Sequence, residues 1–483
     1  MIFFNFFILG TLTSLIYPPF FFLPLGLIIF PLIIYLLSNK LREKSYVKYF
    51  FFGFSFGFGF LLIYLLWIVN PFLVFESTRP FAILSLFLPL FLSIFFGLGF
   101  LLYRNIKRPI GLILFTPFIF ILIEFLISKL LYGFPWISNS LILSNNLFGF
   151  LIIKYFGTYS SGFLILSIFL LPTIIYFRNS IISFRRLIII IYSSFILILL
   201  VTFVFSPSNN KKIYKEISIE GFQILSPVEH KNKQKTKQDI FNLINDSDSD
   251  YIIFGENNFP YLIDKNDHNK MTNFINNQKN IIIGATTYKD NNYYNSFLFF
   301  EQGKVHFFDK KILVPFGEFL PFRKYLKFIE PISGNIDFKS GKNERILITD
   351  DNIKILPIIC YEIIFDNIFK NINNKKIDFI VNITNDSWFG DKIGPYQHFY
   401  ITRIKSLIAN RPIIRVSNNG ISAIIDQNGN IIKSTKLNRR ESLKYNLKIN
   451  NDMSYIKVHK YFSYYLIFIF IIVFIIVRYN SNE

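Results

Sequence analysis

Residues 353–362, Ile-Lys-Ile-Leu-Pro-Ile-Ile-Cys-Tyr-Glu, contain a short apolar run that ends at a cysteine. A run of roughly four to eight apolar residues predicts a buried β-strand. Cys360 is the single cysteine of the chain, so an intrachain disulfide and a multi-cysteine metal site are excluded. An isolated cysteine is usually a small buried hydrophobic residue. At the end of a strand, just before Tyr361 and Glu362, it is instead a candidate nucleophile.

The alternation of apolar strands with amphipathic stretches extends over residues 207–460. We predict strands at 215–224, 250–255, 280–287, 294–301, 304–308, 353–360, 377–384, 412–417 and 421–426, and helices at 234–246, 265–278, 362–372 and 395–410. Asn428-Gly429-Asn430 predicts a turn between two strands. Interleaved strands and helices indicate an α/β domain with covered sheets, and about 250 residues can bury a core as one domain.

Two more polar residues follow apolar strands in this domain. Glu256 follows residues 251–255, and Lys310 follows residues 307–309. Loops and helix N-termini meet at strand ends in α/β folds, so functional sites collect there. Each residue by itself would ordinarily be a surface charge. Together, a carboxylate could deprotonate the Cys360 thiol while an ammonium stabilises the negative charge on an attacked carbonyl oxygen.

Histidine is the alternative base for a cysteine nucleophile. Of the five histidines, His398 is the best candidate, but nothing in the local sequence pairs it with Cys360. We therefore favour Glu256 as the base.

The N-terminal part of the chain is too apolar for a water-soluble protein. Hydrophobic residues make up 52% of the whole chain, and residues 1–206 consist largely of Phe, Leu and Ile. A helix needs about 20 mostly apolar residues to span a bilayer. Candidate spans lie at 2–17, 20–37, 49–70, 81–103, 109–131, 149–176, 187–206 and 461–477. The first lacks a basic n-region and a small-residue cleavage site, so we predict a retained span rather than a signal peptide.

Basic residues mark alternate loops between these spans. They cluster at 40–48, 104–108 and 178–186, which the positive-inside rule places in the cytoplasm. The predicted organisation is a bundle of seven spans at 1–206, an extracytoplasmic domain at 207–460, and an eighth span with a cytoplasmic tail at 461–483. The net charge of +20 suits anionic lipid headgroups. Because no nucleic-acid-binding motif accompanies this charge, we expect no nucleic-acid partner.

These features resemble the nitrilase superfamily, whose members use a Glu–Lys–Cys triad in an α-β-β-α sandwich. More closely, the chain resembles the apolipoprotein N-acyltransferase family, in which such a domain is joined to eight membrane spans. The matching stretches are Gly255–Pro260, Asp309–Glu318, Ile359–Glu362, Asn385–His398 and Arg415–Gly420. The resemblance implies a multi-span α-helical membrane bundle plus a nitrilase-like α-β-β-α sandwich domain.

The resemblance also implies residue roles: the nucleophile is Cys360, the general base Glu256 and the oxyanion-stabilising cation Lys310. The residues that support them are Glu318, Tyr361 and Glu362. A phospholipid would give its acyl group to the cysteine as a thioester. The N-terminal amine of a diacylglyceryl-cysteine on an apolipoprotein would then accept it. No metal or cofactor is implied.

We expect a monomer in a bacterial cell inner membrane, with the catalytic domain in the periplasm. One stretch departs from the family pattern. Near Gln223 the family usually has a Gln-x-Asn segment followed by a Lys-Trp pair, whereas residues 223–231 contain no Trp. If that Trp seats an acyl chain or lipopeptide in the family, this protein must seat it differently.

Two other functions fit parts of the sequence. A membrane-anchored nitrilase-type amidase that hydrolyses a small amide would share the triad but use water in the second step, and eight spans exceed what an anchor needs. A transporter or channel would need functional polar residues within its spans. Glu124 is the obvious acid within a span, and no series of proton-relay residues accompanies it.

Overall fold

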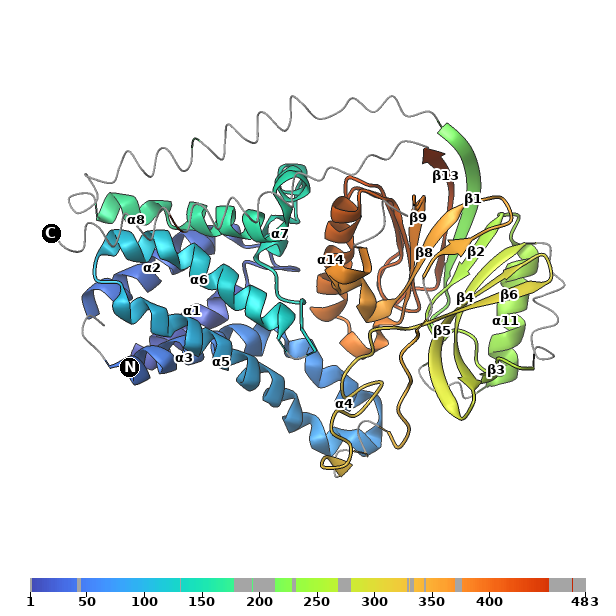
Figure 1. Cartoon of the computed structure of the whole chain (residues 1–483), viewed down its shortest axis with the longest axis horizontal. Coiled ribbons are helices and arrows are strands. Elements are labelled where there is room, and N and C mark those ends of the chain that lie inside the picture. The colour runs from blue at the N-terminus through green and yellow to red at the C-terminus, as the bar shows by residue number, and fades with distance from the viewer. Residues whose placement is uncertain are drawn as a thin grey trace. The chain divides into compact units, whose positions relative to one another are not determined.

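The computed structural model describes residues 2–40, 45–130, 132–177, 193, 213–227, 232–267, 279–327, 330, 334–342, 345–369, 376–450 and 471. The chain forms two compact units. One comprises Met1–Ile68, Ile83–Ser208 and Ile456–Glu483, and the other comprises Val69–Ala82 and Asn209–Tyr455. The first is helical, and the second is built mainly from β-sheet (Figure 1).

The helices of the first unit are strongly apolar. They are α1 (Ile2–Ser14), α2 (Gly26–Tyr35), α3 (Tyr46–Tyr64), α5 (Phe87–Leu101), α6 (Pro109–Lys129), α7 (Leu147–Phe169) and α8 (Leu171–Tyr176). Among the described residues, four helical stretches are long and apolar enough to cross a membrane: Tyr46–Tyr64, Glu76–Asn105, Pro109–Lys129 and Leu147–Phe169. Ile2–Ser14 and Leu23–Asn39 are shorter apolar helices. The predicted spans at 187–206 and 461–477 lie almost wholly outside the described residues.

The carboxylate of Glu124 is bound within the helical unit. Its Oε2 accepts hydrogen bonds from the backbone N and the Nδ2 of Asn139, at 2.9 and 2.7 Å. Its Oε1 accepts from Ser138 Oγ at 2.8 Å. Both partners lie in the segment that follows α6, so the acid joins that segment to the helix. This bonding favours a structural role and gives no support to a transport pathway.

The second unit contains two β-sheets. The first has the order β13-β1-β2-β4-β5-β6, with β3 paired to β4. Its strands are β1 (Ile213–Gln223), β2 (Tyr251–Phe254), β3 (Ile263–Asp264), β4 (Asn280–Lys289), β5 (Asn292–Glu301), β6 (Lys304–Asp309) and β13 (Glu441–Asn450). The second sheet has the order β12-β11-β10-β9-β8-β7. Its strands are β7 (Leu347–Ile348), β8 (Lys354–Ile359), β9 (Phe379–Thr384), β10 (Ile413–Ser417), β11 (Ala423–Ile425) and β12 (Ile431–Ser434).

The two sheets pack face to face between two helices (Figure 1). Helix α11 (Lys233–Asp246) covers the first sheet, where its Ile240 and Ile244 are fully buried in a cluster with Phe254 and Ile283. Helix α14 (Gly394–Ala409) covers the second sheet, and its Thr402 contacts Arg415 of β10. The layers therefore follow the order α-β-β-α, which confirms the predicted sandwich.

The carboxyl ends of the central strands of both sheets lie at one edge. Strands β1, β2 and β4 are parallel, as are β8, β9 and β10. The two sets meet where the backbone N of Glu256, just after β2, donates to the carbonyl of Thr384 at the end of β9 (3.4 Å). We call this side of the sandwich, which also includes Gln223, Cys360 and Ser417, the carboxyl edge.

Among the described residues, the sequence located most of these elements, with one error and several omissions. The helix predicted at 265–278 lies almost wholly outside the described residues. The helix predicted at 362–372 is wrong in its described part, because two 3₁₀ turns, Cys360–Ile364 and Asp366–Phe369, replace it. The side chain of Glu362 binds backbone N–H groups outside a helix and so fixes the first turn. The turn predicted at 428–430 is confirmed and joins β11 to β12, with Gly429 at a φ of 77°. Strands β3, β7, β12 and β13 were not predicted.

Gly284 of β4 should be needed for Glu256 to lie at the carboxyl edge. A Cβ added at Gly284 would lie 2.6 Å from both Asn257 N and Glu256 Cα, which are backbone atoms. We expect Gly284→Ala to destabilise the protein by about 1–3 kcal/mol through overpacking and to reduce activity. Gly221→Ala in β1 is the matched control, because its close neighbour is a side-chain methyl of Val416 that can move. A lower midpoint of thermal unfolding for Gly221→Ala than for Gly284→Ala would contradict this account.

Candidate active site

Glu256 lies two residues beyond the end of β2 and is 5% exposed. Its Oε1 accepts hydrogen bonds from Asn295 Nδ2 at 2.7 Å and from Lys310 Nζ at 3.3 Å. Its Oε2 accepts from the backbone N of Asn385 at 2.9 Å. These donors come from β5, from the end of β6 and from the end of β9. The carboxylate is thus fixed by groups from both sheets.

The ammonium of Lys310 lies between two carboxylates. Lys310 follows β6 and is 2% exposed, and its Nζ lies 2.9 Å from Glu318 Oε1 as well as 3.3 Å from Glu256 Oε1. Asn295 Nδ2 also donates to Glu318 Oε1, at 2.8 Å. The other oxygen of Glu318 accepts from the backbone N of Val314 at 2.9 Å. Glu318 therefore holds both the lysine and the loop that follows it.

Cys360 lies at a strained turn directly after β8. Its φ is 48°, in the left-handed region that non-glycine residues seldom occupy, and such strain is concentrated at functional sites. Cys360 is 5% exposed and begins the 3₁₀ turn Cys360–Ile364. The charges of Glu256 and Lys310 both act on its thiol. The structure thus brings together the three residues that the sequence placed on separate strand ends.

Glu362 fixes this turn by accepting hydrogen bonds from backbone N–H groups. It is fully buried, and its Oε2 accepts from the backbone N of Ile359 at 2.9 Å. Its Oε1 accepts from the backbone N of Lys311 at 2.6 Å and of Ile312 at 3.0 Å. The guanidinium of Arg345 binds both Glu362 and the carbonyl oxygen of Asp309. Glu362 and Arg345 therefore join the strand end before Cys360 to the strand end before Lys310.

The electrostatics favour a protonated thiol and a charged lysine before substrate binds. Burial, and then the charge of Glu256, raise the pKa of Cys360, whereas Lys310 lowers it less strongly. Burial alone would lower the pKa of Lys310, but Glu318 and Glu256 more than offset this and raise it. Burial also raises the pKa of Glu256, although Lys310 opposes the shift. The arrangement suits a base that takes the thiol proton during attack rather than a preformed thiolate.

Tyr361 and His398 each have a side-chain neighbour other than Glu256. Tyr361 is 6% exposed, its ring lies against Phe365 with centroids 5.1 Å apart, and burial raises its pKa. His398 Nδ1 lies 2.9 Å from Asp386 Oδ1, and burial lowers the pKa of this histidine. The structure gives His398 a carboxylate partner other than Glu256.

Asp386 is the centre of a second buried charge group. Besides His398, it binds Arg415 Nη2 at 2.6 Å, and all three residues are fully buried. Burial opposes ionisation of Asp386, but Arg415 and His398 together outweigh burial and hold the pKa of Asp386 well below its usual range. The adjacent Asn385 supplies the backbone N–H that binds Glu256. The Asp386 group thus fixes the loop on which part of the site depends.

The loop after Asp386 contacts a segment that is distant in sequence but belongs to the same compact unit. Asn70 of α4 (Asn70–Val74) donates through Nδ2 to the carbonyl of Phe389 at 3.2 Å. The ring of Trp388 lies near that of Phe75, with centroids 6.2 Å apart. Residues 69–82 therefore help to hold the loop that follows Asn385.

Sequence reasoning missed three residues of this site. Asn295, Arg345 and Asp386 all bind a charged group of the site or its supports. The local sequence gives no signal for them, because none of the three directly follows an apolar strand. Among the described residues, no group of three or more His, Cys, Asp or Glu side chains is arranged to hold a metal ion.

Two family models match parts of the chain. Residues 269–450 match the carbon–nitrogen hydrolase family model, and residues 9–171 match that of the apolipoprotein N-acyltransferase N-terminal domain. The fold and the matches define a membrane-bound protein of the carbon–nitrogen hydrolase superfamily.

Two relatives extend the match over nearly the whole chain. Apolipoprotein N-acyltransferases of Rickettsia typhi and Rickettsia prowazekii are 31% and 30% identical to it, each over 89% of this chain and 89% of their own length. The chain belongs to the apolipoprotein N-acyltransferase family.

Arg345 should contribute to stability by neutralising Glu362. Arg345→Met leaves a fully buried carboxylate without its cation, so we expect a loss of about 3–5 kcal/mol, measured by unfolding of the purified protein. Adding Glu362→Gln to this variant should restore part of the loss, because the unpaired charge is removed.

Arg323→Met is the matched control for this prediction. Its partners Glu330 and Asp337 have side chains that are 31% and 37% exposed, so water can solvate them and the loss should be smaller. Equal losses for the Arg345 and Arg323 variants would refute the role given to burial.

Proposed function

We propose that this chain transfers a fatty-acyl group from a membrane phospholipid, through a thioester on Cys360, to the N-terminal amine of a diacylglyceryl-cysteine on an apolipoprotein. N-acylation of lipoproteins is the activity of the family to which the chain belongs. The observation on which the mechanism rests is the convergence of Glu256, Lys310 and Cys360 at the carboxyl edge.

In the first step, the sulfur of Cys360 attacks the ester carbonyl carbon of the phospholipid. The thiol proton passes to Glu256, and a C–S bond forms. The tetrahedral intermediate then collapses, the ester C–O bond breaks, and the proton on Glu256 passes to the leaving alkoxide oxygen. A lysophospholipid departs and the acyl group remains as a thioester.

Lys310 would stabilise the oxyanion of this intermediate. An ammonium group has three N–H donors, and Glu318 and Glu256 occupy two of them. The third remains for the carbonyl oxygen of the substrate. Because the site is buried, the attraction between the ammonium and the developing negative charge is stronger than it would be in water.

In the second step, the amine of the lipoprotein attacks the thioester carbon. Glu256 accepts a proton from the attacking nitrogen, a C–N bond forms, and the C–S bond breaks. The proton returns to the sulfur, so that the enzyme ends as it began. An amide is more stable than a thioester, which drives the transfer forward.

A lipid substrate is also consistent with the surroundings of the site. The loop after Lys310 exposes large apolar side chains, namely Phe316 at 43%, Phe322 at 72% and Tyr325 at 76%. Apolar side chains gathered in this way mark surfaces that meet apolar partners. The basic loops between spans support an extracytoplasmic position for the catalytic domain.

A thioester on Cys360 is the first result that we expect. The purified full-length protein, incubated with phospholipid, should show a hydroxylamine-labile fatty-acyl adduct on Cys360 by peptide mass spectrometry. Adding a diacylated lipopeptide should discharge the adduct and yield a triacylated product. Cys360→Ala, which removes the nucleophile, is the control. Discharge by water alone would instead identify an amidase, and a folded protein without any adduct would refute the mechanism.

The rate of thioester formation should fall at acid pH as Glu256 becomes protonated. Because burial raises the pKa of Glu256, this fall should begin above the ordinary glutamic acid range of about 4.3. The hydrogen bond from Asn295 favours the charged carboxylate and lowers its pKa, so Asn295→Ala should shift the fall to still higher pH.

Asn292→Ala is the control for the pH profile. Asn292 lies on the same strand, and its amide binds the carbonyl of Asp290, away from Glu256. Its profile should match that of the unmodified protein. A shift to lower pH in Asn295→Ala would contradict the assignment of Glu256 as the base.

A further inference from the structure

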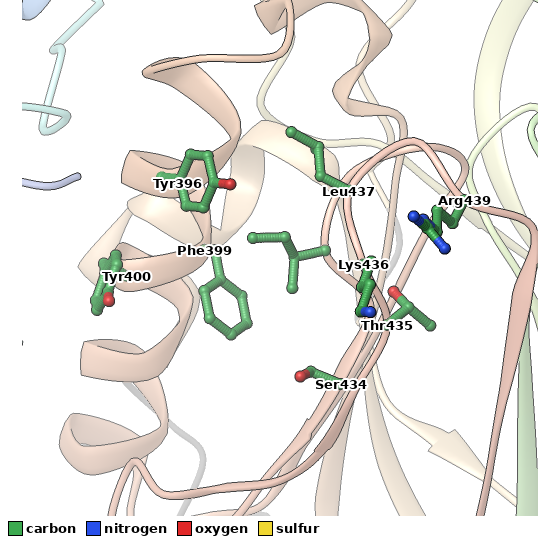
Figure 2. A pocket seen from close by; sticks show the side chains of 9 residues that line it. Tyr396, Phe399, Tyr400, Ser434, Thr435, Lys436, Leu437 and Arg439 are labelled. Carbon is green, nitrogen blue, oxygen red and sulfur yellow. The ribbon is translucent and has the colours of Figure 1, made fainter.

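A cavity of about 460 Å³ lies between α14 and the loop that joins β12 to β13. Figure 2 shows Tyr396 and Phe399 along α14 on one side, and Lys436, Leu437 and Arg439 on the loop that faces them. The wall from α14 is therefore largely aromatic. The loop adds one apolar side chain and two cations.

The loop side of this cavity is rigidly built. Gln223, which is fully buried, donates through Nε2 to the carbonyl of Lys436 at 2.8 Å and to that of Arg439 at 2.9 Å. Thr435 Oγ1 donates to Gln223 Oε1 at 2.8 Å. Three groups from one short loop are thus held by Gln223 at the end of β1. A preformed cavity binds a ligand without the cost of ordering a mobile loop.

The cavity belongs to the carboxyl edge. Strand β13 runs antiparallel to β1 from Glu441, which pairs with Gln223, and β12 ends at Ser434 opposite Ala423. The loop between them therefore lies beside the ends of the parallel strands. Its Asn438 is bonded to Asn419 through both backbone and side chain.

Asn419, which binds Asn438 of the cavity loop, and the adjacent Asn418 connect that loop to the active site. The side chain of Asn418 donates to Asn385 Oδ1 at 3.5 Å, and the backbone N of Asn385 binds Glu256. The cavity and the catalytic carboxylate are therefore joined by a chain of direct contacts along one edge.

The two cations of the loop have no carboxylate partner within the described part of the chain. Their neighbour Arg440, by contrast, lies 3.7 Å from Asp239. Lys436 and Arg439 are both exposed and remain available to an anion. Arginine and lysine are the usual ligands of phosphate groups in proteins.

We propose, on the basis of the acyl transfer proposed above, that this cavity binds the phosphate of the phospholipid donor. Lys436 and Arg439 contact the phosphate, while Tyr396, Phe399 and Leu437 contact the adjoining apolar part of the lipid. A lipid fits better than an acidic peptide, because cations and an apolar wall in one cavity match a ligand that is anionic at one end and apolar beyond it. The position at the carboxyl edge lets the same lipid present its ester toward Cys360.

The test compares donor dependence in the full-length protein. Thioester formation on Cys360 is measured against the concentration of a short-chain phosphatidylglycerol for the unmodified protein and for the double variant Lys436→Gln/Arg439→Gln. We expect the half-saturating concentration to rise about tenfold with little change in maximal rate, since two charge-assisted contacts to the ground-state ligand are lost.

Two controls isolate the phosphate contact. Lys433→Gln removes a cation from the same hairpin, but its Nζ binds the carbonyl of Lys444 outside the cavity, so donor dependence should not change. The matched diacylglycerol, which offers the same esters without a phosphate, should be used equally well by the double variant and the unmodified protein.

Several results would overturn the proposal. One is an unchanged half-saturating concentration of phosphatidylglycerol in the double variant, and another is an equal effect of the substitutions on the use of diacylglycerol. A change only in the half-saturating concentration of the lipopeptide acceptor would assign the cavity to the peptide. Binding of inorganic phosphate as tightly as the lipid would identify a free-anion site instead.

Failure of the acyl transfer itself would be distinguishable. If the unmodified protein forms no thioester, calorimetry of phosphatidylglycerol binding still tests the cavity. Binding that the double substitution weakens about tenfold would support a lipid site without the transfer chemistry. Binding that the substitution leaves unchanged would refute the site.

Discussion

The buried ammonium of Lys310 between two carboxylates is the interaction on which the active site depends. Glu256 and Glu318 would repel each other in a space that excludes water, and the lysine makes their coexistence possible. One cation between two carboxylates still leaves an excess of negative charge. Asn295 partly compensates for it by donating to both carboxylates, and Asn385 donates to Glu256 from the other sheet. Burial nevertheless outweighs these donors, so the pKa of Glu256 stays raised and the carboxylate can act as a base.

Two further buried carboxylates near this centre are each paired with an arginine. Glu362 is paired with Arg345, and Asp386 with Arg415, and both carboxylates are fully buried. Each pair also binds backbone or side-chain groups at a strand end. Such pairs add little net stability, because removing charges from water is costly, but they tie loops to defined positions. The strained φ of Cys360 persists because Glu362 holds the strand end on one side of it and the Lys310 loop on the other.

The cavity beside α14 bears on the one stretch in which the chain departs from its family pattern. Residues 223–231 contain no Trp, yet Gln223 is fully buried and anchors the loop with Lys436 and Arg439. The aromatic side chains of this cavity come from α14 instead. Gln223 at the end of β1 therefore holds this loop in place, although the Trp that usually follows in the family is missing.

The sequence by itself determined the apolar helical part, the α/β class of the second unit, and the three strand ends at which Glu256, Lys310 and Cys360 lie. Apolar runs and their period depend on local composition, so they can be detected without knowing any contact. Strand β13 was not predicted, although Leu443, Tyr445, Leu447 and Ile449 alternate with polar residues, which is the pattern of a half-buried strand. The strand pairs along almost the whole of β1.

Only the tertiary structure decided which polar residues complete the site. Direct hydrogen bonds join Asn295 to Glu256, Arg345 to Glu362, and Asp386 to Arg415. The partners in these bonds are 39, 17 and 29 positions apart in the sequence. Nothing in the local sequence distinguishes them from ordinary polar residues. Their roles arise from the parallel register of two facing sheets, which brings strand ends together, and from burial, which makes every unpaired charge costly and so selects the partners.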